Sequence, residues 1–281
     1  WLVKGDFSKA LTHMSKLMTN NPDAARDYFP LLLNYSEQNA SLAAFRGQPV
    51  VSTAWWPAFF NYAAVNAVNT ATVRALYALH PGAEALDASV HTSYLSRLQR
   101  DGAWMEAYFA WLNRLGKDDL GQLATIYNGG FERPPSGVGF DWITARTHNV
   151  SITPASTYGV IGDRALRLSF NGQRVPGNLI HQFTVLAPGN YSMRGRIRAD
   201  GLKISRGLEW TLTCVGTATP LAVSERFAGS DQWRFFTLQF AIPDVGCQGQ
   251  DLSLRVAASV PLDYQVDGVA WFDDLIIQSV D

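Results

Sequence analysis

Carboxylates stand at two places in this chain where they could do chemistry. Glu132 and Asp141 follow a pair of glycines, and Asp273 and Asp274 lie in a strand-like segment near the end. Two facing carboxylates are enough to hydrolyse a glycosidic bond, but adjacent residues of a strand point to opposite faces, so Asp273 and Asp274 are not such a pair. The sequence also contains no nucleophile elbow, P-loop, H-E-x-x-H or dinucleotide-binding motif. We therefore expect a protein that is not an enzyme.

A second group of polar and aromatic residues suits binding rather than catalysis. Its members alternate with apolar residues in three strand-like segments, 190–199, 207–215 and 233–242. Because successive side chains of a strand point to opposite faces, this group is predicted to point away from the core. The residues are Trp233, Phe235, Arg194, Arg196 and Glu209.

The chain has two cysteines, Cys214 and Cys247, which allow one pairing. A disulfide between them would contribute about 3–4 kcal/mol by closing that loop. The alternative is a pair of buried free thiols. We favour the disulfide, because the strand-rich surroundings look like those of a secreted module.

Composition excludes several classes of protein. With 47% hydrophobic and 17% charged residues among 281, the chain can bury a sizeable core. The net charge of −1 argues against a general nucleic-acid partner, and no apolar run is long enough to span a membrane. The chain begins at Trp1. We expect it to be a fragment of a longer protein, with a signal or anchoring segment upstream.

The elements that position these residues change in kind near residue 125. Before it, apolar residues recur at helical spacing, and after it, short alternating segments are separated by Gly, Pro and Asn. The stretch 126–142, which contains the glycine pair, marks the change. We predict a multidomain α + β protein with a helical domain at 1–124 and an antiparallel β-sandwich at 125–281.

The helical half resembles tetratricopeptide repeats. The resemblance rests on Gly5-Asp6-Phe7, Ala10-Leu11 and Pro22, with a weaker echo at Gly102-Ala103-Trp104. It implies helical hairpins that hold a protein partner on a concave surface. Helices are expected near 6–20, 24–36, 38–45, 57–68, 70–79 and 87–100. An aromatic cluster either lines the groove or forms core between hairpins; it comprises Trp55, Trp56, Phe59, Phe60 and Tyr62.

The β half resembles carbohydrate-binding modules of the galactose-binding-like jelly-roll group, including the xylan- and glucan-binding families. Strands are expected near 149–153, 164–170, 179–186, 190–199, 207–215, 233–242, 251–259 and 269–279. The resemblance covers the whole half. It is carried by Asn128-Gly129-Gly130-Phe131-Glu132, Phe140-Asp141-Trp142, Pro188-Gly189-Asn190-Tyr191 and Trp271-Phe272-Asp273-Asp274.

This resemblance implies a structural calcium held by Glu132 and by Asp273 or Asp274. The alternative is that these carboxylates hydrogen-bond turn amides or pair with Arg133 or Arg164. Calcium is the only cofactor that we expect.

The resemblance also implies sugar binding, in which aromatic rings stack on pyranoses and polar groups bind hydroxyls. Trp233 and Phe235 are the predicted stacking rings, and Arg194, Arg196 and Glu209 the predicted polar partners. An arginine-rich face suits an acidic polysaccharide. The alternative is a solvated sheet face. Further candidates are Tyr158, Tyr264, Trp142, Arg167 and Arg198.

From the pairing of the two domains we expect a non-catalytic, exported scaffold of the periplasm or the cell exterior. Its helices would hold a protein partner and its jelly roll would contact polysaccharide, in envelope or exopolysaccharide export. The alternative is a pure assembly subunit whose jelly roll has lost sugar binding.

Overall fold

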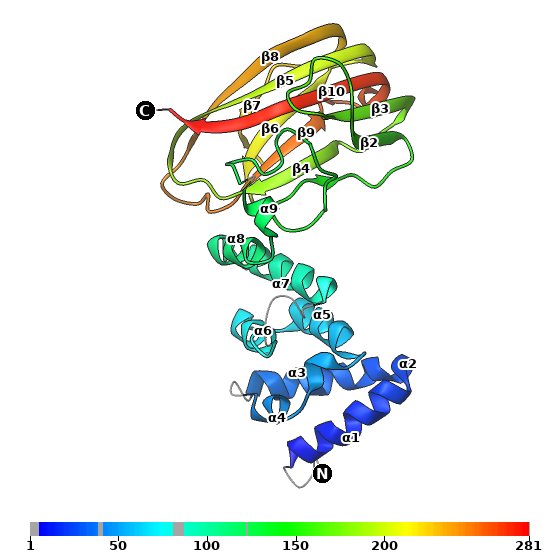
Figure 1. Ribbon diagram of the computed structural model, residues 1–281, viewed down its shortest axis with the longest axis vertical. Coiled ribbons are helices and arrows are strands. Elements are labelled where there is room, and N and C mark those ends of the chain that lie inside the picture. The colour runs from blue at the N-terminus through cyan, green and yellow to red at the C-terminus, as the bar shows by residue number, and fades with distance from the viewer. Residues whose placement is uncertain (1–5, 39–41, 81–86, 122, 281) are drawn as a thin grey trace. The chain divides into compact units, whose positions relative to one another are not determined.

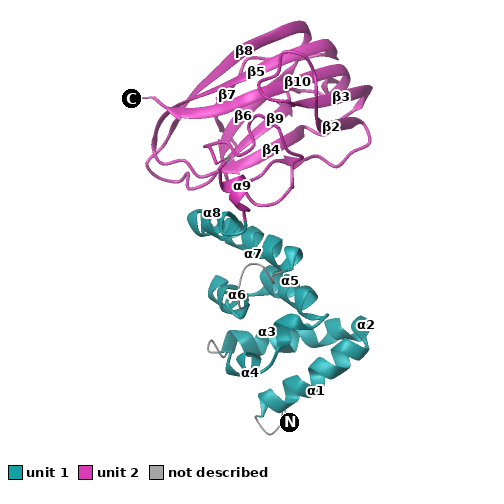
Figure 2. Cartoon of the chain, viewed as in Figure 1, with its two compact units in different colours: residues 1–114 teal, residues 115–281 magenta. Residues whose placement is uncertain are grey.

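The computed structural model describes residues 6–38, 42–80, 87–121 and 123–280 (Figure 1). The chain divides into two compact units, residues 1–114 and residues 115–281 (Figure 2). The boundary expected at residue 124 falls inside unit 2, after the short helix α9 (Lys117–Leu120). Within the described ranges, no helix has both the length and the apolar character needed to cross a membrane.

Unit 1 is helical throughout its described part. Asp6 caps its first helix by accepting a hydrogen bond from the backbone N–H of Lys9 at 3.1 Å. The helices are α1 (Phe7–Asn20), α2 (Pro22–Ala25), η2 (Arg26–Tyr28), α3 (Phe29–Gln38), α4 (Ala43–Arg46), η3 (Val50–Ser52), α5 (Trp56–Asn66), α6 (Thr70–Tyr77), α7 (Ala88–Arg100) and α8 (Trp104–Leu112).

The expected helices correspond to the observed ones with one exception. Pro30 lies in the first turn of α3, where its lack of an N–H costs nothing. The helix expected at 38–45 falls partly outside the described residues, and α4 alone is seen in its range. The structure therefore establishes a helical unit without establishing a tetratricopeptide repeat.

The aromatic cluster of unit 1 is core. Trp55, Trp56, Phe59 and Phe60 are all buried, so of the two alternatives for this cluster the structure shows core between helices for these four rings. The indole N–H groups still find partners: Trp55 donates to Ser15 Oγ and Trp56 to His80 Nε2, each at 3.1 Å.

Unit 2 consists of two antiparallel five-stranded sheets. One sheet has the order β1-β4-β9-β6-β7, and the other has the order β2-β3-β10-β5-β8. Figure 1 shows the sheets as two layers. The strands are β1 (Ile143–Thr144), β2 (Val150–Ala155), β3 (Ala165–Arg174), β4 (Asn178–Thr184), β5 (Gly189–Ile204), β6 (Leu208–Cys214), β7 (Pro220–Val223), β8 (Gly229–Ile242), β9 (Gln250–Val256) and β10 (Gln265–Ser279), with the short helix η4 (Pro261–Tyr264) before the last.

The two sheets enclose one hydrophobic core, and alternation along the strands decides which residues enter it. Trp210 of β6 and Phe272 of β10 meet edge to face there, with ring centroids 5.5 Å apart. The apolar residues that alternate with the polar ones in 207–215 and 233–242 are buried as expected, among them Trp210, Leu212, Phe236 and Leu238. The antiparallel sandwich predicted for this half is therefore confirmed. The short strands β1 and β7 were not predicted.

The predicted disulfide between Cys214 and Cys247 is present. Cys214 ends β6, and Cys247 lies in the turn before β9, the strand that pairs with β6. Both cysteines are buried. The disulfide therefore links the end of β6 to the turn that leads into β9, at one end of the sandwich.

Candidate functional site

The outer face of the sheet β2-β3-β10-β5-β8 carries a row of three arginines. Arg194, Arg196 and Arg198 alternate along β5 with Gly195 and Ile197, which face the core. A Cβ at Gly195 would lie only 2.4 Å from Leu275 Cδ2 and 2.6 Å from Phe236 Cζ. The close packing under the row therefore requires glycine there and fixes the direction of the arginines on both sides of it.

Aromatic rings from β8 and β10 lie between these arginines. The guanidinium carbon of Arg194 is 5.3 Å from the ring centroid of Phe235, and that of Arg196 is 4.9 Å from Trp233. At the other end, Arg198 lies 4.8 Å from Trp271. Cations at these distances from ring faces are attracted by the quadrupole of the ring. We call this alternating row the arginine ladder; its members are Arg194, Arg196, Arg198, Trp233, Phe235 and Trp271.

The segment between β2 and β3, residues 156–164, is bonded across part of the ladder. Arg198 Nη1 donates to Thr157 Oγ1, Arg196 Nη2 donates to the carbonyl of Gly159, and Trp233 Nε1 donates to the carbonyl of Tyr158, at 2.7–2.8 Å. Gly159 has φ +71°, and a Cβ on it would lie 2.9 Å from Trp233 Cδ1. The segment thus needs glycine to lie this close to the ladder.

Two ladder members remain open to solvent. The side chains of Arg196 and Arg198 are only 14% and 6% exposed, whereas Arg194 is 53% exposed and Phe235 is 56% exposed. Tyr158, whose ring lies over Arg198, is exposed as well. The part of this face that a ligand can reach is therefore the end formed by Arg194 and Phe235.

The structure brings four of the five predicted ligand-binding residues together. Trp233, Phe235, Arg194 and Arg196 all belong to the ladder, but Glu209 lies on β6, in the other sheet, where it forms an ion pair with Arg226 at 3.2 Å. The expectation that Glu209 shares their face is corrected. Alternation tells which side of a strand a residue takes, but it does not tell which sheet the strand joins.

Other candidates from the loops turn out differently. Trp142 is fully buried in the sandwich core, with its ring centroid 5.7 Å from that of Trp210, so it offers no surface for stacking.

Trp271 was not among the predicted site residues. Strand pairing places it opposite Arg167 and Arg198, and therefore in the ladder. The sequence pattern alone does not identify it, because this pairing has to be known first.

The predicted calcium ligands lie at the junction of the opening segment with β10. Glu132 Oε1 accepts hydrogen bonds from the backbone N–H groups of Asp163 and Arg164 at 3.0 and 3.4 Å. Asp273 is fully buried and accepts from the backbone N–H groups of Ile161 and Asp274, each at 2.8 Å. Burial raises the pKa of the Asp273 carboxyl, although these amide donors act in the opposite direction.

The backbone around this junction is unusual. Asn128, Phe131 and Asp274 have positive φ of 51°, 55° and 52°. Asn and Asp adopt this left-handed region fairly readily, whereas a bulky residue such as Phe131 adopts it only when its surroundings require it. Gly129 accepts a hydrogen bond from the N–H of Leu275 at 3.0 Å, and a Cβ on Gly129 would lie 2.1 Å from the Leu275 carbonyl oxygen. The opening segment is therefore fastened to a bulge in the last strand.

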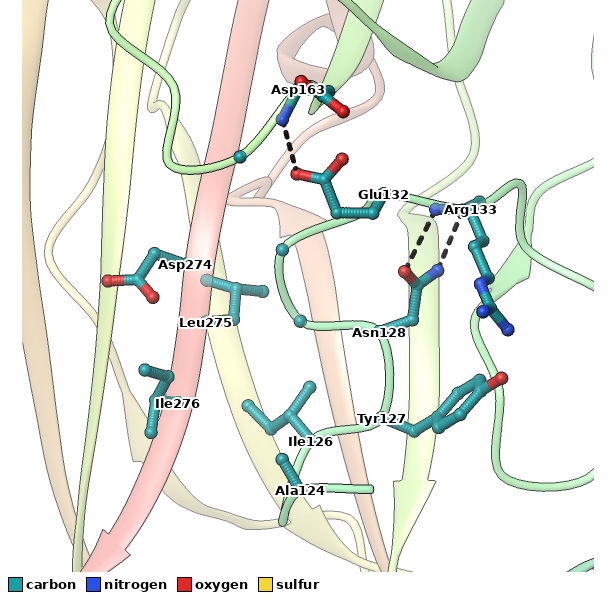
Figure 3. Close-up of a pocket in the computed structure, with 13 residues that line it drawn as sticks. Ala124, Ile126, Tyr127, Asn128, Glu132, Arg133, Asp163, Asp274, Leu275 and Ile276 are labelled. Atoms are coloured by element: carbon teal, nitrogen blue, oxygen red, sulfur yellow. Dashed lines mark hydrogen bonds between the residues drawn. The ribbon is translucent and has the colours of Figure 1, made fainter. Parts of the chain in front are cut away.

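A cavity of about 560 Å³ lies beside this junction (Figure 3). Glu132 and Asp163 stand close together on one side of it, and the Asp274 carboxylate points away from them (Figure 3). Asp274 instead pairs with Arg194 at 3.2 Å. The rest of the cavity lining comes from two segments, 124–133 and 274–276, together with Gly162. It includes polar side chains, those of Asn128 and Arg133, beside apolar ones.

These carboxylates are bonded to protein donors rather than grouped around a common point. In the described part of the chain, no set of three or more His, Cys, Asp or Glu residues could hold a metal ion. The contacts seen are those of the alternative, in which Glu132 and Asp273 hydrogen-bond turn amides. Calcium binding stays a prediction.

Titrating calcium into chelator-treated protein checks this prediction. We expect a heat of binding together with a rise in melting temperature, because an ion that binds only the folded state stabilises it. Glu132→Gln should weaken both effects. If the wild-type chain gives neither heat nor a rise, calcium has no place in this unit.

Comparison with known proteins finds structures similar to this chain but does not assign it to a family. No family model matches the chain, and no curated protein matches it. Among solved structures, a CBM4 structure is 16% identical over 55% of this chain and 99% of that chain, with a TM-score of 0.40. The cyclase Fisc from Fischerella sp. TAU is 17% identical over 56% and 97%, with a TM-score of 0.39. The CBM22-1 xylan-binding domain of Paenibacillus barcinonensis Xyn10C is 12% identical over 54% and 92%, with a TM-score of 0.36. At these values the comparisons say nothing about a ligand of this chain.

Proposed function

We propose that this chain is a non-catalytic binding protein whose β unit holds polysaccharide on the outer face of the sheet β2-β3-β10-β5-β8. The observation that carries the proposal is the exposed ring of Phe235 beside the half-exposed guanidinium of Arg194. An apolar ring next to a hydrogen-bonding group is what a pyranose needs, since its faces are apolar and its edges are polar.

Unit 1 has the role of a scaffold for a protein partner in this proposal. Small residues lie buried on its helices, with Ala10 on α1, Ala63 and Ala64 on α5, and Ala107 on α8. Alanine at such positions lets helices pack closely, as in tetratricopeptide-like hairpins. The disulfide supports a periplasmic or extracellular setting, such as envelope or exopolysaccharide export.

The carboxylates support a role without catalysis. Asp273 has no exposed surface, and both of its oxygens accept backbone hydrogen bonds. Glu132 is engaged by two amides of the neighbouring turn. A general acid or a nucleophile must reach the substrate, and these two groups hold protein segments instead.

A second candidate function follows from the segment 156–164. Because this segment is bonded to Arg196, Arg198 and Trp233, most of the ladder serves to hold it in place. A unit that uses its ladder only in this way would be an assembly subunit that no longer binds sugar.

A glycan array probed with the full chain separates the two candidates. Under the proposed function we expect binding to polysaccharides and a loss of about tenfold or more in Phe235→Ala, since stacking on the ring is removed. Phe109→Ala is the matched control, because Phe109 in unit 1 is also 56% exposed. An array without hits, or equal loss in both variants, would favour the assembly subunit.

A further inference from the structure

The three arginines of the ladder differ in what neutralises them. Arg198 pairs with Asp200 at 2.8 Å, and Arg196 pairs with the buried Asp273 at 3.5 Å; both also donate to the segment 156–164. The positive charges of Arg196 and Arg198 are thus neutralised by carboxylates of the protein itself. Arg194 lies beyond these segment contacts, at the open end of the ladder.

The partner of Arg194 is Asp274 of β10, whose side chain is only 14% exposed. Asp274 Oδ2 accepts from Arg194 Nη2 at 3.2 Å, and the arginine side chain is 53% exposed. Water reaches the arginine side of this pair and screens it in part. A ligand carboxylate can therefore approach the exposed side of Arg194 and compete there with Asp274.

Phe235 adds a second requirement on the occupant. Its ring lies beside the Arg194 guanidinium, with 5.3 Å from the guanidinium carbon to the ring centroid, and more than half of its surface is exposed. A ligand that uses both groups presents an apolar face to the ring and a planar anion to the guanidinium. A pyranose bearing a carboxylate has both features, whereas a neutral pyranose has only the first.

We propose that Arg194 and Phe235 bind a uronate unit of an acidic polysaccharide, whose carboxylate replaces Asp274 on Arg194. The inference rests on the proposed function, because it names the ligand class for the same face. The arginine contributes a bidentate donor fork that lysine lacks, and its position beside Phe235 limits the rotamers that it can adopt. Asp274 occupies the anion position when no ligand is bound.

The test measures binding of the full chain to polygalacturonate, to neutral dextran and xylan, and to polyglutamate. We expect polygalacturonate to bind most tightly, with a loss of about tenfold in Arg194→Gln and a smaller loss in Arg194→Lys. Asp274→Asn should tighten binding by about threefold, because it frees Arg194 of a competing charge. Asparagine tolerates the left-handed backbone at this position.

Two control variants separate this site from general charge effects. Arg255→Gln removes an exposed arginine on β9 of the other sheet, and Asp267→Asn removes a carboxylate of β10 that lies 3.9 Å from Lys203. Neither change should alter affinity. Equal effects of Arg194→Gln and Arg255→Gln, or of Asp274→Asn and Asp267→Asn, would overturn the proposal in favour of long-range charge.

The polymers distinguish the remaining outcomes. Polyglutamate binding as tightly as polygalacturonate would overturn the role of the pyranose. Neutral polysaccharides binding equally well, with no effect of Arg194→Gln, would overturn the acidic ligand while leaving the proposed function standing. Binding to none of the polysaccharides would overturn both.

Discussion

Loss of the Cys214–Cys247 bond is expected to lower the free energy of unfolding of unit 2 by about 3–4 kcal/mol. The two cysteines are 33 residues apart in sequence, so the bond removes much of the freedom of that loop in the unfolded chain. Urea unfolding of the full chain, with and without a thiol reductant, measures the change. Tryptophan fluorescence follows both units, since each holds tryptophans, and helical circular dichroism follows unit 1, so that comparing the two signals isolates the unit 2 transition.

The double variant Cys214→Ser and Cys247→Ser checks that the bond itself is responsible. It should unfold at the same urea concentration as the reduced wild type, and reductant should no longer affect it. The unfolding of unit 1, which holds neither cysteine, serves as an internal control. An unchanged unit 2 transition after full reduction would contradict the expectation.

Alternation in the sequence was enough to predict the strands of this sandwich other than β1 and β7. The alternation is visible because each sheet buries one face, so every second residue of a strand must be apolar. Leu212 and Leu238 are examples of such buried positions. The strands that escaped prediction, β1 and β7, are the short outer strands of one sheet. Segments this short bury too little to show a pattern.

The candidate site could be predicted only in part, because its geometry depends on pairing between distant segments. The periodicity of β5 and β8 placed Arg194 and Phe235 on an outer face, but it could not join that face to Trp271 of β10 or separate it from Glu209 of β6. Nor does sequence show that Gly159 approaches Trp233 closely. The contact of segment 156–164 with the ladder decides which ladder residues remain exposed to solvent.

The aromatic residues show the same limit in unit 1. Aromatic residues such as Trp55 and Phe59 occur both in binding grooves and in cores, so the sequence does not tell which they form. The packing shows that both are buried in the core. In unit 2, Trp142 stands in a segment of turns and is nonetheless fully buried, with its indole N–H donating to the Asn128 carbonyl at 3.1 Å. An aromatic residue in a loop is therefore a poor guide to a sugar-binding surface.

Acidification is expected to destabilise unit 1 through His91. This residue on α7 is 5% exposed, and its Nδ1 lies 2.9 Å from the Tyr77 hydroxyl on α6. Nε2 is buried and has no hydrogen-bond partner among the described residues. Burial, together with the positive charge of Arg114, lowers the pKa of His91 to about 4 from its ordinary value of 6.5.

The sign of the pH effect follows from the direction of this shift. Between pH 6.5 and pH 4 the unfolded chain binds a proton at His91 and the folded chain does not, so stability falls as the pH falls through this window. The full effect is about 3 kcal/mol, since each unit of pKa difference corresponds to about 1.4 kcal/mol. The neighbouring His80, whose pKa burial also lowers, acts in the same direction.

Urea unfolding of the full chain at a series of pH values, followed by helical circular dichroism, measures this dependence. His91→Phe removes the titrating group while keeping a ring in the packed site, so unit 1 should lose most of its pH dependence between 6.5 and 4. The variant should be less stable at pH 7 by about 1 kcal/mol, because the Tyr77 hydroxyl loses its partner. His13→Phe alters an exposed histidine on α1 and should keep the wild-type slope. If His91→Phe and the wild type lost stability equally on acidification, the effect would lie in carboxylates such as Glu106 and Asp101, whose pKa values are lowered in the folded state.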